Sequence, residues 1–173
     1  MSSLPILHFS SRPPFSFERL LAMCEGVICA EDIDCVKASV GICYSAEAEP
    51  ALPSAGRKWQ TFETSLRNEL VKTRAARKKI NPEKYTRGEA YGDPYFAHIA
   101  VHAHRNPSIL QAERDLDGER WRFLEKIGAG HYFDIDALIV YASKLFILER
   151  WERINNMDRG GALEDTLKQE EAV

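Results

Sequence analysis

The sequence predicts an all-α protein, a helical bundle arranged around one central buried helix at about residues 132–154. The stretch 131–154, which reads HYFDIDALIVYASKLFILERWERI, is apolar on nearly every side when placed on a helix. Such helices are usually surrounded by other elements. Elsewhere, apolar residues recur at helical spacing, and no segment alternates as a half-buried strand does. Asx-Pro pairs and glycines stand where helices are expected to begin and end.

Length and composition favour one globular domain. A chain of 173 residues is long enough to bury a core as a single domain, 1–173. The net charge of −3 offers no general attraction for nucleic acid or an anionic membrane. The apolar run of the central helix is too short and too often interrupted by charge to span a bilayer, and the first residues lack the pattern of a signal peptide. We therefore expect a cytoplasmic protein without direct membrane insertion.

The first quarter of the chain predicts an irregular segment and two short helices. Three prolines exclude a helix within residues 1–15. Ser16 is a good N-cap for a helix at 17–26, and Cys29 occupies the N-cap of a second helix at about 30–40. The four cysteines, at 24, 29, 35 and 43, lack the spacing of a zinc site. We expect them to be small buried hydrophobic residues, with a metal or iron–sulfur site as the weaker alternative.

A loop at 45–56 separates these helices from the rest of the chain and is the expected boundary if the domain divides into two lobes. It contains two prolines and shows no periodicity. A long helix is expected from Arg57 to about Lys79. Glu63 and Arg67 have the spacing of an ion pair on its surface. Its apolar stripe is narrow, as in a two-helix seam, and consists of Trp59, Phe62, Leu66 and Leu70.

The second half of this long helix, VKTRAARKKI, is basic. Cations are favoured at the C-terminal end of a helix and on its solvated face, which is the simpler interpretation of these residues. The alternative is a docking surface for an acidic partner or for nucleic acid. Nucleic acid is the less favoured of the two because no aromatic residues are interleaved with the cations.

Three Asx-Pro pairs predict the starts of three further helices, because each places an N-cap residue before a proline at the first helical position. The pairs begin at Asn81, Asp93 and Asn106. We expect a short first helix, a second at 94–104 and a third from 107 toward 127. Residues 155–173 form a polar tail, either a weak last helix or a frayed end that becomes ordered on a partner.

The most suggestive cluster of potential ligands consists of His98, His102 and His104. His98 and His102 are four residues apart and share a helical face, as two ligands of a helical metal site do. Ile99 stands where a zincin has Glu, however, and no Glu-x-x-His pair occurs on facing helices. Structural histidines are therefore the preferred interpretation. The sequence contains no catalytic motif that we can identify, and we expect neither catalysis nor a cofactor.

Two parts of the chain resemble a known family. Near the start, SLPILHF is followed by PPFSFERLLAMC and AEDID; near the end stands FLEKIGAGHYFDIDALIVYASKLFILERW. These segments resemble a little-characterised bacterial family of small helical proteins, which are encoded beside the subunits of V-type (vacuolar-type) rotary ATPases. The chain departs from the family in starting almost directly at Ser3, where members carry a Tyr-rich extended segment, and in having Cys29 in place of a hydroxyl cap.

The resemblance implies a non-catalytic accessory, stalk-type or assembly component of a bacterial V-type ATPase, a machine that transports protons or sodium ions. It implies V-type ATPase subunits as partners and a position peripheral to the inner membrane through the complex. Helix faces and charges would set the fit to those subunits. The alternatives are a small helical metal-binding protein or enzyme that uses the histidine cluster and, third, a nucleic-acid-binding adaptor. The residues that we expect in partner contact are Arg74, Arg77, Lys78, Arg150 and Arg153.

Overall fold

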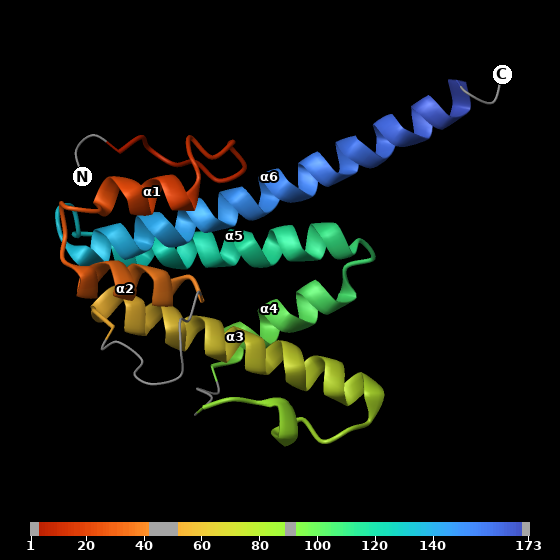
Figure 1. The fold of residues 1–173 in the computed structure, drawn as a ribbon. Helices are drawn as coiled ribbons and strands as arrows, with labels where there is room; N and C mark the ends of the chain where they lie inside the picture. Colours follow the sequence, from red (N-terminus) through yellow and green to blue (C-terminus); the bar gives the residue numbers. More distant parts are fainter. Residues whose placement is uncertain (1–3, 42–51, 89–92, 171–173) are drawn as a thin grey trace.

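The computed structural model describes residues 4–41, 52–88 and 93–170, with side chains as far as Met157 in the last helix. Within these ranges it contains six α-helices, one short 3₁₀ helix and no strand, so the predicted all-α class is confirmed (Figure 1). The elements are α1 (Phe17–Cys24), α2 (Ala30–Ser39), α3 (Ser54–Lys78), η1 (Glu83–Tyr85), α4 (Pro94–Arg105), α5 (Ile109–Gly128) and α6 (Ile135–Glu170). Among the described residues, no helix combines the length and hydropathy needed to cross a bilayer.

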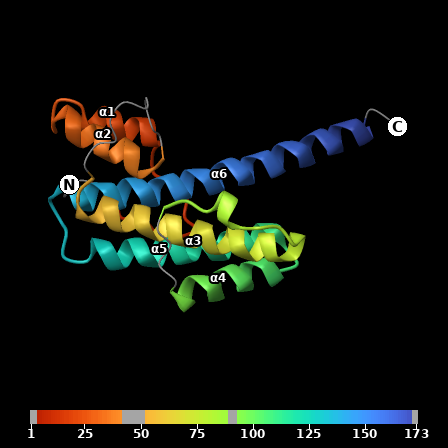
Figure 2. The ribbon, with the colours of Figure 1, turned by 90° about the horizontal axis from the view of Figure 1, so that it is seen from below.

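α6 is the central helix of the bundle. Figure 2 shows α1 and α2 on one side of α6 and α3, α4 and α5 on the other. The buried side chains of α6 accordingly belong to two apolar clusters, which explains why the helix is apolar on nearly every side. The cluster toward α1 and α2 receives Leu138, Ile139, Ala142 and Leu145. The cluster toward α3 and α5 receives Val140, Ile147, Leu148 and Trp151.

The bounds of α6 differ from those predicted at both ends. Its start is set by Asp134, whose carboxylate accepts a hydrogen bond from the Ala137 N–H (2.9 Å) and so caps the first turn. The helix does not stop near Ile154 but continues to Glu170. Residues 155–170 of the expected polar tail therefore extend α6 beyond the bundle (Figure 1).

The N-cap residues in the sequence predicted two helix starts correctly and one incorrectly. Ser16 caps α1 by accepting from the Arg19 N–H (3.2 Å), and Asp93 caps α4 by accepting from the Tyr95 N–H (2.9 Å), as predicted. The start of α5 was predicted at Asn106-Pro107, but its N-cap is Ser108. Asn106 instead ends α4, and its side chain accepts a hydrogen bond from the Ser108 N–H (3.0 Å). Two residues with capping side chains, separated only by Pro107, allow either start.

Two further sequence predictions are corrected in the first half of the chain. The predicted loop at 45–56 is wrong at its C-terminal end, because Ser54–Gly56 already belong to α3; residues 45–51 lie outside the described residues. Of the cysteines, Cys24 and Cys35 are buried as expected, whereas Cys29 is exposed at the N-cap of α2. Cys43 lies outside the described residues.

A buried charge network ties α3, α5 and α6 together. The carboxylate of Asp117 on α5 is fully buried and accepts hydrogen bonds from Arg120 Nη1 (3.0 Å), from Trp151 Nε1 (2.8 Å) and from Arg150 Nη2. Arg120 also donates to Glu63 on α3, with Nε at 2.7 Å from the carboxylate. Every partner of Asp117 is a donor, so the buried negative charge is compensated on three sides.

Candidate functional site

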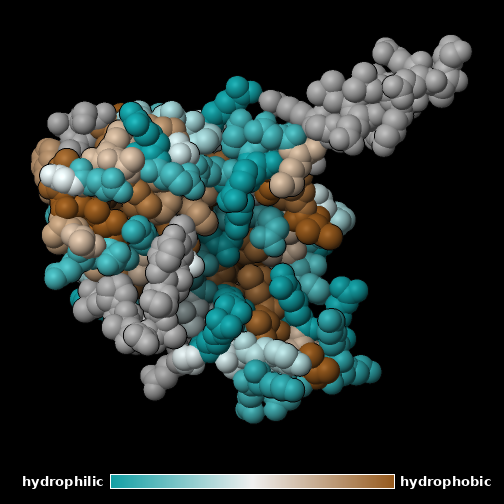
Figure 3. Space-filling view, viewed as in Figure 1, coloured by the Kyte–Doolittle hydropathy of each residue, from teal (hydrophilic) through white to brown (hydrophobic). Residues whose placement is uncertain are grey.

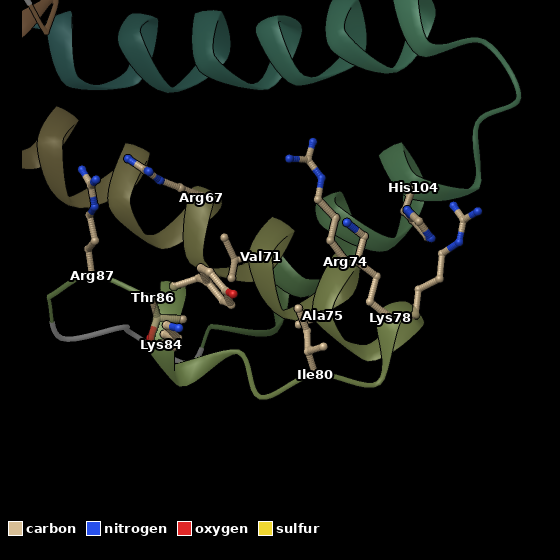
Figure 4. Close-up of a pocket in the computed structure, with 12 residues that line it drawn as sticks. Arg67, Val71, Arg74, Ala75, Lys78, Ile80, Lys84, Thr86, Arg87 and His104 are labelled. Carbon is tan, nitrogen blue, oxygen red and sulfur yellow. The ribbon is translucent and has the colours of Figure 1, made fainter.

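A pocket of about 860 Å³ lies between the second half of α3 and residues 79–88, which we call the returning segment because it runs back along α3 (Figure 4). Half of the residues that line it are Arg or Lys, so we call it the basic pocket. The cations that line it are Arg67, Arg74, Arg77, Lys78, Lys84 and Arg87. The remaining lining residues are Val71, Ala75, Ile80, Tyr85, Thr86 and His104.

α3 supplies one wall of the basic pocket from a single helical face. Each residue of this wall lies three or four positions from another one along the helix, the spacing of side chains on one face. They are Arg67, Val71, Arg74, the buried Ala75, Arg77 and Lys78. From Arg67 to Lys78 this face spans about 16 Å, at about 1.5 Å per residue. The wall thus presents cations along its length, with small apolar residues between them.

The opposite wall is the returning segment, and two devices hold it in place. Lys79 adopts a left-handed conformation (φ 54°) that ends α3, and the Ile80 N–H donates back to the Ala75 carbonyl (3.1 Å). Further along, the fully buried side chain of Asn68 forms two hydrogen bonds with the backbone of Arg87. Its Nδ2 donates to the Arg87 carbonyl (2.8 Å), and its Oδ1 accepts from the Arg87 N–H (3.0 Å).

The basic pocket carries positive charge that no carboxylate among the described residues compensates. No Asp or Glu among the described residues lines it, and none of its six cations forms an ion pair within the described part of the chain. The whole chain has a net charge of −3, so all residues other than these six together carry −9. Charge is therefore segregated, and the field in the pocket attracts anions.

The surface around the basic pocket combines polar and apolar residues. Figure 3 shows hydrophilic side chains over the lower part of the molecule, where α3 ends and the returning segment runs back, with apolar patches among them. Ile80 and Tyr85, which line the pocket, are 45 % and 50 % exposed. The pocket can therefore bury an apolar group as well as bind an anion.

Three of the five residues predicted to contact a partner lie in the basic pocket: Arg74, Arg77 and Lys78. Arg150 and Arg153 do not line it. Arg150 is paired with the buried Asp117, next to the buried Trp151. Arg153 is exposed farther along α6.

Sequence reasoning missed three cations of the pocket and the residue that holds its second wall. Arg67 lies seven residues before Arg74, a spacing that would have indicated a shared face. It was instead expected to pair with Glu63, but Glu63 pairs with Arg120 on α5. Lys84 and Arg87 carry no such signal, because only the turn after α3 brings them back.

The histidine cluster is divided by α4. His98 and His102 line a separate cavity against α5, whereas His104 lines the basic pocket on the side of α3. Within the described ranges, no group of three or more His, Cys, Asp or Glu side chains could hold a metal ion. The geometry thus associates His104 with the basic pocket rather than with the other two histidines.

Comparisons with known proteins found a match only for the second half of the chain. A family model described as "Protein of unknown function (DUF2764)" matches residues 92–170, which include α4, α5 and α6. No curated protein and no solved structure matches the chain. The six cations of the basic pocket all precede the matched residues. Residues 92–170 therefore form a DUF2764 domain, and the basic pocket is built mainly from the part of the chain before it.

Proposed function

We propose that this protein is a non-catalytic accessory or assembly component that docks an acidic surface of a protein partner in its basic pocket. The observation that carries the proposal is the set of six unpaired cations in one pocket, without a carboxylate from the described residues. Charge complementarity of this kind speeds encounter and fixes the orientation of a complex. Four of the six are arginines, whose planar guanidinium groups bind carboxylates through two hydrogen bonds.

We further propose that the partner is a subunit of a bacterial V-type rotary ATPase. The support for this step is the resemblance of the SLPILHF and PPFSFERLLAMC segments and of the block FLEKIGAGHYFDIDALIVYASKLFILERW to a family encoded beside such subunits. On this proposal the protein contributes to proton or sodium transport only by holding or assembling other subunits. It would reside in the cytoplasm, held at the inner membrane by the complex.

Affinity purification from the protein's own cells in mild detergent, followed by mass spectrometry, tests both steps. The pocket variant is the double charge reversal Arg74→Glu/Arg77→Glu. The control is Arg19→Glu/Lys126→Glu, which makes the same change of net charge at two exposed residues outside the pocket. We expect V-type ATPase subunits with the wild type and the control, and at least about a tenfold loss with the pocket variant.

Two results would contradict the proposal at different points. Equal recovery of partners by the pocket variant and the control would remove the basic pocket as the docking site. Recovery of the wild-type protein without any V-type ATPase subunit would remove the proposed partner. Circular dichroism of both double variants shows whether either has lost its helices.

A further inference from the structure

We infer that the basic pocket binds an elongated acidic peptide segment of its partner, with carboxylates on the arginines of both walls and an apolar side chain between them. This inference rests on the proposed docking function and adds the chemistry of what is docked. It requires that the cations be spread out, that part of the pocket be apolar, and that its two walls be fixed before binding.

The cations are spread along the pocket and do not converge on one point. Figure 4 shows Arg67 and Arg87 at one end, Arg74 in the middle, and Lys78 with His104 at the other end. The α3 wall alone spans about 16 Å between its outermost cations. A single phosphate or carboxylate would reach only one end of such a row. An occupant with several anionic groups along its length contacts the whole row.

The apolar residues of the pocket favour a peptide over a nucleic-acid strand. Val71, Ile80 and Tyr85 provide an apolar surface between the charged ends, which suits an apolar side chain of an acidic segment. Single-stranded nucleic acids bind by stacking successive bases on several aromatic rings, and Tyr85 is the one aromatic residue that lines the pocket among those described.

Asn68 acts as a positioning residue for this site. Its side chain does not line the basic pocket, but its two hydrogen bonds hold the backbone of Arg87, 19 residues away in sequence. These bonds fix the backbone of Arg87, whose side chain lines the pocket, before a ligand arrives. A preformed wall reduces the ordering that binding would otherwise require. Replacing Asn68 should therefore weaken binding although no charge is lost.

Fluorescence anisotropy of the full-length protein with labelled probes tests the inference. The main probe is a 12-residue Glu-rich peptide with one central Phe, and the matched probe has Gln in place of every Glu. We expect the Glu peptide to bind, to weaken as salt is raised, and to exceed the Gln peptide at least about tenfold in affinity. Arg74→Glu/Arg77→Glu should lower that affinity at least about tenfold, and Arg19→Glu/Lys126→Glu less than about twofold.

Two variants test the role of Asn68. Asn68→Ala should lower the affinity for the Glu peptide about three- to tenfold, and the salt dependence should decrease as if one ion contact were lost. Arg87→Gln retains the backbone contacts of Asn68 and removes the charge, so it should reproduce both effects even if Asn68→Ala fails to fold. Unchanged affinity and salt dependence in Arg87→Gln would overturn the assignment of Arg87 and Asn68 to this site.

Other occupants give distinct results. Tighter binding of 12-nucleotide single-stranded DNA than of the Glu peptide would make the site a nucleic-acid site, and displacement of the peptide by equimolar inorganic triphosphate would make it a phosphate site. Self-association abolished by Arg74→Glu/Arg77→Glu would make the occupant a second copy of the chain. No peptide binding, combined with loss of the cellular partner in the same variant, would refute the peptide segment and leave the proposed docking function standing.

Discussion

Replacing Asp117 with alanine is expected to lower the free energy of unfolding by about 3–5 kcal/mol. The Asp117 carboxylate is fully buried and compensates two arginines and one indole N–H at once. Without it, the Trp151 N–H has no acceptor, and Arg150 remains half-buried beside Arg120 without its negative partner. Burial lowers the pKa of the Arg150 guanidinium, because desolvation disfavours its charged form.

Urea denaturation followed by circular dichroism measures the effect. Glu125→Ala is the matched control, because Glu125 also lies on α5 and also accepts a hydrogen bond from an indole, that of Trp121 (2.9 Å). Its side chain is 56 % exposed, so its loss should cost no more than about 1 kcal/mol. If Asp117→Ala costs no more than Glu125→Ala, the buried network is not a determinant of stability.

Replacing Leu145 with alanine is expected to cost about 2–5 kcal/mol, because the side chain is completely buried and its removal leaves a cavity. Leu145 lies in the cluster that joins α6 to α1 and α2, where it packs with Phe17, Leu20 and Val36. Met157→Ala is the control on the same helix: that side chain is 74 % exposed, and its loss should change stability by less than about 0.5 kcal/mol.

The same experiment examines whether the two apolar clusters unfold together. Leu124 is the equivalent fully buried residue of the other cluster. Because both clusters take side chains from α6, we expect Leu145→Ala and Leu124→Ala each to shift one cooperative transition. Two separate transitions, each moved by only one of the variants, would show that the lobes on either side of α6 fold independently.

The helical fold could be predicted from the sequence because its signals are local. The period of apolar residues identified α3, α5 and α6, and the absence of a polar face on α6 identified the central helix. Val140 and Ile147, two of the residues that leave α6 without a polar face, belong to the apolar cluster with α3 and α5. Helix ends were less predictable: tertiary context decided between Asn106 and Ser108, and α6 passes Asn155 without a break.

The candidate site was only partly predictable because it depends on contacts between distant residues. The basic run on α3 indicated Arg74, Arg77 and Lys78 directly. Nothing in the local sequence pairs Asn68 with Arg87, since that contact requires the turn after α3. Likewise, the charged end of α6 gave no sign that Arg150 would meet a buried carboxylate on α5, because only the packing of the two helices brings them together.

Carbodiimide cross-linking of the complex captured from the protein's own cells tests the central claim most directly. This zero-length reagent joins a lysine amine to a carboxylate only where the two are in contact, and the basic pocket contains two lysines, Lys78 and Lys84. We predict that mass spectrometry finds these two lysines joined to Asp or Glu residues of the partner. Cross-links that involve Lys58 or Lys126, with none from Lys78 or Lys84, would show that the partner docks elsewhere.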